Sequence, residues 1–265
     1  MNKRIWVSRT IMIVVLALFL LGCGLATDNW VLTDKKYKVW GGERGNERHN
    51  PDMTVSWSGD ADTEGYASGN GVLQWFKSGN LIIYYEGTML KGKVQGKGVV
   101  TWVRNGNHYE GDFVDDERQG KGVFTWADGS RYEGDFVDNK RQGKGVMTFV
   151  NGNRYEGDFV DGKWHGKGVF TWGKGFRYEG DFFNDYMHGK GVFTSSDKRR
   201  YEGDFVYNKM QGKGVLTFSN GDRYDDRYEG DFVDNSFDGI GTLYKKDGSI
   251  VQQGQWKSGL FVGPK

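Results

Sequence analysis

One tripeptide, Tyr-Glu-Gly, recurs through the chain at a nearly constant interval, and it constrains the fold more than any other feature of the sequence. It begins at Tyr85, Tyr109, Tyr132, Tyr155, Tyr178, Tyr201 and Tyr228. Eleven residues after each of these tyrosines comes a Gly-x-Gly motif, so the whole unit repeats in register with a period of about 23 residues. Such self-similarity is typical of repeat arrays, in which each unit mainly contacts its neighbours.

The unit at residues 155–177 has the pattern of two β-strands joined by a turn. Residues 155–160 alternate between two faces with the two-residue period of a strand, residues 161–163 have turn composition, and residues 166–172 alternate again. Each unit is therefore predicted to be a β-hairpin. The link to the next unit is short, so successive hairpins pair side by side, and eight units with strands about 4.8 Å apart predict a sheet on the order of 75 Å long.

The two faces of these predicted strands differ in chemistry. One face carries aromatic residues and glycines, and we expect each glycine to leave bare backbone on which a neighbouring ring lies. The repeat glycines with this expected role in the most regular units are Gly134, Gly143, Gly145, Gly157, Gly166, Gly168 and Gly180. The other face carries Glu, Asp and Lys, and pairing across the turn predicts a contact between Asp158 and Lys167. That charge pattern favours a solvated face over a binding site.

With its Tyr-Glu-Gly start, turn glycine, paired Gly-x-Gly and trailing aromatic residue, the unit resembles the MORN repeat over roughly residues 56–260. The resemblance implies an all-β fold, an elongated, twisted, single-layer antiparallel sheet of about eight tandem β-hairpins without a conventional core. We expect the array to span residues 56–265, with a degenerate unit at 56–84, regular units at 85–250 and a half-unit cap at 251–265. Four extra residues, Arg223 to Asp226, predict a bulge or a longer loop.

The N-terminal residues 1–22 have the pattern of a bacterial export signal. Basic residues at Lys3, Arg4 and Arg9 precede an uncharged apolar stretch at residues 11–21. Eleven residues are too few to cross a hydrocarbon core of about 30 Å, which needs about 20. The segment is therefore predicted to direct export, and residues 23–55 that follow it are predicted to be an irregular tether.

The apolar stretch ends in Leu20-Leu21-Gly22-Cys23, which resembles the bacterial lipobox, and Cys23 is the only cysteine of the chain. The resemblance implies that Cys23 is acylated and anchors the protein in a membrane of the bacterial cell envelope. Gly24 follows where an Asp would resemble an inner-membrane retention signal, so the outer membrane is favoured if the envelope has two. The alternative is an uncleaved signal anchor over residues 11–26.

Charge and motif content exclude several functions. The chain has 36 basic and 35 acidic residues, so it lacks the basic excess on which nucleic-acid binding depends. His165 and His188 share a repeat position at which other units have Gln, a pattern that fits neither a metal ligand nor a general base. The sequence predicts no catalytic residues, no metal site and no cofactor, and hence a protein that is not an enzyme.

Two classes of function remain open. The first is an interaction scaffold whose aromatic and glycine face takes a protein or peptide partner, or another copy of the chain. The second is binding of surface or cell-wall glycans by stacking, and a weaker third is membrane phospholipid recognition, which the family's name implies. The candidate binding residues are Tyr132, Phe136, Tyr155, Phe159, Phe170, Trp172, Tyr178 and Phe182. The alternative for these rings is that most pack only on their own glycines.

Overall fold

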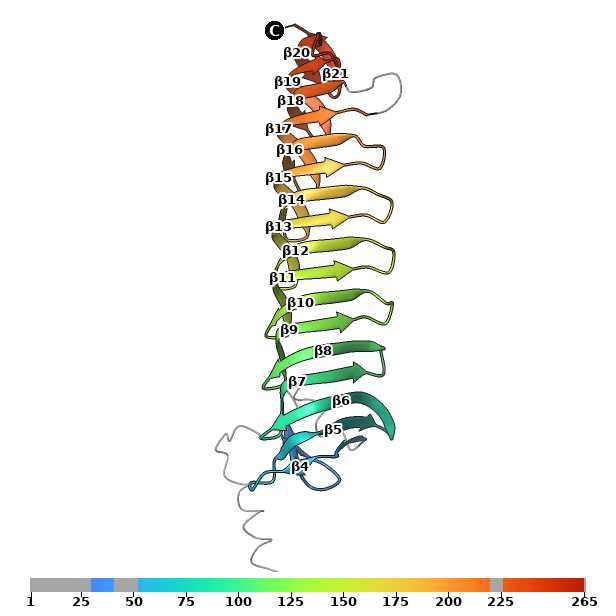
Figure 1. The fold of residues 1–265 in the computed structure, drawn as a ribbon, viewed down its shortest axis with the longest axis vertical. Helices are drawn as coiled ribbons and strands as arrows, with labels where there is room; N and C mark the ends of the chain where they lie inside the picture. The colour runs from blue at the N-terminus through green and yellow to red at the C-terminus, as the bar shows by residue number, and fades with distance from the viewer. Residues whose placement is uncertain (1–29, 41–51, 220–225, 265) are drawn as a thin grey trace, which may run out of the picture.

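The computed structural model describes residues 30–40, 52–219 and 226–264, which form β-strands joined by turns (Figure 1). The strands are β1 (Trp30–Leu32), β2 (Lys38–Trp40), β3 (Met53–Trp57), β4 (Asp60–Ala61), β5 (Ala67–Lys77), β6 (Asn80–Leu90), β7 (Lys93–Trp102), β8 (Asn107–Val114), β9 (Glu117–Thr125), β10 (Arg131–Val137), β11 (Lys140–Thr148), β12 (Arg154–Val160), β13 (Lys163–Thr171), β14 (Arg177–Phe183), β15 (Tyr186–Thr194), β16 (Arg200–Val206), β17 (Lys209–Thr217), β18 (Arg227–Val233), β19 (Ser236–Tyr244), β20 (Ile250–Lys257) and β21 (Leu260–Gly263). These residues include no helix that is long and apolar enough to cross a membrane.

Strands β3 to β21 form one long antiparallel sheet in which, from β5 onward, each strand pairs with the strand that follows it in the chain. β3 and β4 both pair with β5, and the pairing then continues strand by strand to β21. Figure 1 shows these strands as rungs along the long axis, with β4 near one end and β21 at the other, so the sheet is open. The structure confirms the predicted all-β array of tandem hairpins.

A separate hairpin, β1 and β2, packs at the N-terminal end of this sheet. The ring of Trp30 meets that of Tyr66 edge-on at 4.8 Å, and Val39 is fully buried. The backbone N–H of Lys38 also donates a hydrogen bond to the carbonyl of Gly65. This corrects the expected irregular tether for residues 30–40, because Trp30 and Val39 pack against the first unit. The signal segment with Cys23 and the insert at 223–225 lie outside the described residues.

In each repeat, the tyrosine of the Tyr-Glu-Gly motif packs on glycine backbone of its own hairpin. A Cβ added to Gly157 would lie 2.5 Å from the hydroxyl oxygen of Tyr155, and one added to Gly168 would lie 2.6 Å from it. The ring of Tyr155 therefore covers bare glycine backbone, as predicted. That hydroxyl donates a hydrogen bond of 2.9 Å to the carbonyl of Asp158. The other six repeat tyrosines bond the residue three positions on in the same way. In the degenerate first unit the indole N–H of Trp57 takes this role.

The first glycine of each Gly-x-Gly has a different reason to be glycine. Gly166 has a φ of 56°, in the left-handed region, and its added Cβ would approach the Asp158 carboxylate instead of a ring. Here Gly157 pairs with Gly168 whereas Asp158 pairs with His165, which leaves a β-bulge in the second strand. The expected ring-covering role is therefore wrong for Gly143 and Gly166 and right for the second glycine of each pair.

The buried rings form one continuous column along the array. Tyr155 meets Phe159 of its own unit edge-on at 5.2 Å and Phe182 of the next unit at 5.0 Å. Tyr132 and Tyr178 make the same two contacts with their own and the following phenylalanine. Because each phenylalanine is shared by two tyrosines, the core of one hairpin is completed only by its neighbour.

Candidate functional site

The eight aromatic residues predicted to line a binding groove lie inside this column or against it. Tyr132, Phe136, Tyr155, Phe159, Phe170, Tyr178 and Phe182 are each at most 6% exposed. Trp172 is half-buried and packs on Phe170. Burial raises the pKa of the repeat tyrosines, to about 12 for Tyr109 and Tyr228. The expected open groove on the aromatic face is therefore corrected, because the protein fills that face with its own rings.

A groove of about 2120 Å³ instead follows the opposite face of the sheet, from the hairpin of Glu86 to that of Glu229. The five hairpins between these two ends contribute the same residue types to it: the glutamate after the tyrosine, the lysine between the paired glycines, the valine after them, and two glycines. Glu156 lies opposite Val169 of its own hairpin and Val146 of the preceding one. The groove therefore presents alternating Glu and Val side chains beside glycine backbone.

A ladder of ion pairs runs along the same face and joins successive hairpins. Asp158 bonds Lys144 of the preceding hairpin at 2.6 Å, with side chains 31% and 71% exposed. The equivalent pairs are Lys97–Asp112, Lys121–Asp135, Lys167–Asp181, Lys190–Asp204 and Lys213–Asp231. The ion pair expected between Asp158 and Lys167 is thus wrong, because the bulge moves Lys167 out of register and only its backbone N–H reaches Asp158.

A second set of ion pairs holds the glutamates of the groove. Arg154 and Glu156, two residues apart on one strand, contact at 2.6 Å, and both side chains are about half exposed. The same pair recurs as Arg131–Glu133, Arg177–Glu179, Arg200–Glu202 and Arg227–Glu229. Exposed pairs of this kind contribute about 0.2–1 kcal/mol each, so a partner that offers competing charges displaces them at low cost.

The hairpin turns tie each unit to the one before. Asp138 and Asn139 both have positive φ, the conformation of a type I′ turn, and Asn139 Oδ1 accepts the backbone N–H of Arg118 at 3.0 Å. In an earlier hairpin, Asp116 occupies the turn position equivalent to Asn139, and its Oδ1 accepts the backbone N–H of Val94. The Oδ2 of Asp116 has no hydrogen-bond partner among the described residues. Burial raises the pKa of Asp116 to about 6.

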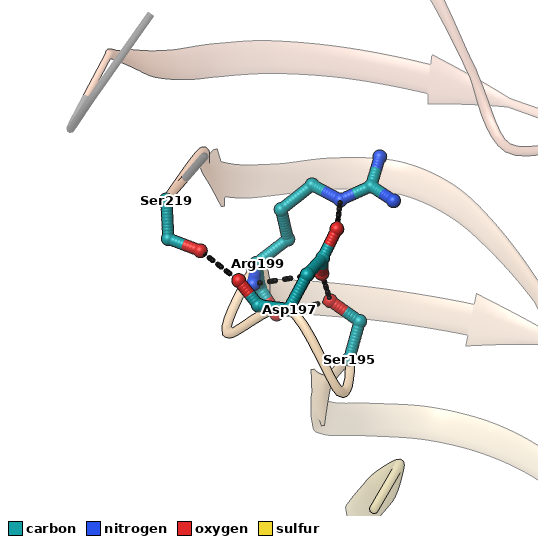
Figure 2. A network of polar contacts seen from close by, with 4 residues as sticks. All are labelled: Ser195, Asp197, Arg199 and Ser219. Carbon is teal, nitrogen blue, oxygen red and sulfur yellow. Dashed lines mark hydrogen bonds and ion pairs between the residues drawn. The ribbon is translucent and has the colours of Figure 1, made fainter. Parts of the chain in front are cut away.

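The loops at the other edge are linked to one another as well (Figure 2). The Ser195 hydroxyl donates to the Asp197 carboxylate, which lowers its pKa, and Arg199 Nε contacts that carboxylate at 2.9 Å. Ser219 of the following loop donates to the carbonyl of Asp197. Ser195 stands where other units have a trailing aromatic residue, so a polar network replaces ring packing at this loop.

The groove presents the same polar groups in successive hairpins along its length. Within 30–40, 52–219 and 226–264, no three His, Cys, Asp or Glu side chains are placed to hold a metal ion. The carboxylates of the groove recur in each unit with the same partner. Fold and groove together define a tandem β-hairpin repeat protein.

The family model for the MORN repeat matches most of the array. The matched residues are 85–106, 109–131, 132–154, 155–177, 178–198, 201–223, 228–250 and 253–264, more than half of the chain. The chain therefore belongs to the MORN-repeat family, which is typically non-catalytic. No curated protein matches the sequence.

Solved structures with some likeness to the chain are distant. The TCP domain of Drosophila melanogaster SAS-4 (dCPAP), in complex with a proline-rich motif of Ana2 (dSTIL), is 9% identical. The match covers 60% of this chain and 85% of that one, with a TM-score of 0.38. The wild-type TCP10 domain of Danio rerio CPAP is 10% identical over 86% of this chain and 99% of that one, with a TM-score of 0.36. Neither likeness carries an argument about function.

Proposed function

We propose that the chain is a non-catalytic interaction scaffold of the bacterial cell envelope that binds a protein or peptide partner along its sheet. The observation that carries this proposal is the groove of about 2120 Å³, which offers the same Glu, Lys, Val and Gly side chains and backbone in hairpin after hairpin. A long surface of identical sites suits an extended partner segment, since each hairpin adds a similar small contribution to binding. The membership of a typically non-catalytic family supports the same class.

The chemistry of the groove supports a polar, extended partner. Each lysine ammonium has three donors, so the ion pair with Asp leaves donors for carbonyl oxygens of a bound segment. Val146 and Val169 are half-buried and offer apolar contact between the charges. The burial of the predicted aromatic face removes the reason to place a partner on that side.

Site-specific photo-crosslinking in the native envelope tests this proposal. A photoreactive residue at Val169, inside the groove, is expected to give discrete crosslinked species of defined mass. The same residue at Val150, which is 68% exposed and outside the groove lining, is the matched control. Identical products from both positions, or no product from Val169, would contradict a partner in the groove.

We further propose that the lipid on Cys23 anchors this scaffold in the membrane. The support is the lipobox-like Leu20-Leu21-Gly22-Cys23 at the end of an apolar stretch. Labelled palmitate is expected to enter the parent chain and not the Cys23→Ala variant, and the mature parent chain is expected to begin at an acylated Cys23. A parent chain that takes up no palmitate and keeps residues 1–22 would favour the uncleaved anchor at residues 11–26.

A further inference from the structure

Departures from the repeat pattern gather at one place on the face opposite the buried rings. Phe183 stands where Val137 and its equivalents stand in the other regular units. Three positions further on, Tyr186 replaces the Lys or other polar residue of the other units. In the next turn Tyr207 stands at a position that elsewhere carries Asp or Asn. Three polar or aliphatic positions have thus become aromatic in two adjacent hairpins.

These aromatic side chains contact one another through the two histidines that share a repeat position. His165 lies 5.3 Å from Phe183, and Phe183 lies 5.8 Å from His188, between ring centroids. His188 lies 5.3 Å from Tyr207, which meets Tyr186 edge-on at 5.5 Å. We call Phe183, Tyr186, His188 and Tyr207 the aromatic patch, and His165 flanks it. Together with His165 it crosses β13, β14, β15 and the turn after β16, so these residues form one continuous surface.

The aromatic patch is accessible, unlike the aromatic column on the other face. Phe183, Tyr186 and Tyr207 are 41%, 45% and 56% exposed. Among the described residues, neither tyrosine hydroxyl has a hydrogen-bond partner, and the same holds for the buried Nδ1 of His188. The patch therefore combines exposed ring faces with two tyrosine hydroxyls that are available to a ligand.

The backbone at Tyr207 is strained. Its φ is 47°, in the left-handed region, which Asn, Asp and Gly adopt far more readily than a bulky aromatic residue. The equivalent turn positions Asp138, Asp161 and Asp234 have φ between 46° and 50°. An aromatic residue at this position makes the turn less stable, and such strain is typical of positions kept for binding.

The size of the patch selects the class of ligand. Three rings that are about half exposed offer on the order of 300 Å², far less than the roughly 800 Å² that each partner gives to a stable protein interface. The charged groups next to it are already engaged, since Asp185 accepts the N–H of Trp164 and Lys209 pairs with Asp234. A small, uncharged, amphipathic ligand fits these properties better than a protein or an ion.

We propose that the aromatic patch of Phe183, Tyr186, His188 and Tyr207, flanked by His165, binds one or two sugar rings of a glycan. The apolar face of a pyranose ring stacks on an aromatic ring, and its hydroxyls bond to the tyrosine hydroxyls. The residues of this site do not line the groove, so a failure of the glycan proposal would leave the scaffold proposal unaffected, and the reverse also holds.

Binding to the full chain, purified in detergent, tests the proposal by isothermal titration calorimetry. The probes are chitotetraose and cellotetraose, two neutral β-1,4-linked tetramers, and choline chloride as a cation that aromatic rings also bind. The parent chain is expected to bind a tetramer at one site. The triple variant Phe183→Val, Tyr186→Lys, Tyr207→Asp, which restores residues of the other units, is expected to weaken binding about tenfold or more.

Two further variants separate binding from folding. Tyr207→Asp alone is expected to weaken binding and raise the Tm, because it relieves the strained turn. The changes Val137→Phe, Lys140→Tyr, Gln142→His and Asp161→Tyr copy the patch two hairpins away and are expected to raise the stoichiometry to two. Absence of binding to both tetramers, unchanged binding by the triple variant, or binding of choline alone would overturn the proposal.

Discussion

Asp158 joins two successive hairpins through its contact with Lys144: its Oδ1 lies 2.6 Å from the ammonium of that lysine in the preceding hairpin. Its Oδ2 accepts the backbone N–H of Lys167 in its own hairpin at 3.1 Å. One carboxylate thus stabilises the bulge of its own unit and the contact with the previous unit. The repeat of this arrangement at Asp181 and Asp204 gives the array its register.

We predict that Asp158 couples energetically to Lys144 and not to the side chain of Lys167. A double-mutant cycle of Asp158→Ala with Lys144→Ala should give a coupling energy of about 0.2–1 kcal/mol in urea unfolding. The matched cycle with Lys167→Ala should give a value near zero, since that contact uses the backbone. Equal couplings in the two cycles would contradict the pairing across hairpins.

The two glycines of a Gly-x-Gly should respond differently to substitution. Gly168→Ala places a Cβ 2.6 Å from the Tyr155 hydroxyl oxygen and should destabilise by about 3 kcal/mol or more, as expected for severe overpacking. Gly166→Ala forces Ala to a φ of 56° and should cost about 1–2 kcal/mol.

A background that lacks the Tyr155 ring distinguishes these two causes. In a Tyr155→Ala chain the cost of Gly168→Ala should fall sharply, whereas the cost of Gly166→Ala should stay the same. Chemical denaturation measures all four differences. A cost of Gly168→Ala that persists without the ring would mean that backbone contacts alone exclude the methyl group.

Asp116→Asn should stabilise the protein at neutral pH. Burial raises the pKa of Asp116 to about 6, against the attraction of Lys93 and with the repulsion of Asp115 and Glu117. The folded chain therefore holds this proton more tightly than the unfolded chain, whose Asp pKa is about 3.9, and stability falls as the pH rises from about 4 through 6.

Asparagine keeps the bond to the Val94 N–H, as Asn139 does for Arg118, and carries no charge. The gain from Asp116→Asn should therefore be about 1–3 kcal/mol above pH 7 and vanish below pH 4. Thermal unfolding across this pH range measures the difference. An equal gain from Asp116→Asn at pH 4 and at pH 7 would contradict this account.

Deletion of residues 155–177 should shorten the array without disturbing its neighbours. Removing these residues joins Arg154 directly to Tyr178, keeps the loop after Thr148, and brings Phe182 onto Tyr132 in place of Phe159. The longest dimension in small-angle scattering should fall by about 9–10 Å, the width of two strands. Loss of cooperative unfolding in the shortened chain would show that the units are not interchangeable.

The sequence predicted the hairpin array because Tyr155, Gly157 and Phe159 recur with both the strand period and the repeat period. It also predicted that rings lie on glycine backbone, as Tyr155 does on Gly168. It missed the bulge, because a positive φ at Gly166 leaves no mark in the alternation of residue types. The wrong partner for Asp158 follows directly from that one missed feature.

The candidate site was harder to predict than the fold. A pattern of alternating residues separates two faces but does not say which face is filled by its own side chains. Tyr132 and Phe159 look like an exposed stripe in sequence, and only their contact across two hairpins shows that they are buried. The aromatic patch at Tyr186 and Tyr207 was also missed, although its signal, a local loss of the repeat pattern, is present in the sequence.

The strands run across the long axis of the molecule, and this sets its mechanical behaviour (Figure 1). A pull along that axis loads the backbone hydrogen bonds between adjacent strands a few at a time, as in the opening of a zipper. Each hairpin that opens releases about 23 residues, or up to roughly 80 Å of extended chain. Under tension the array would therefore lengthen in equal steps at low force and act as an extensible spacer.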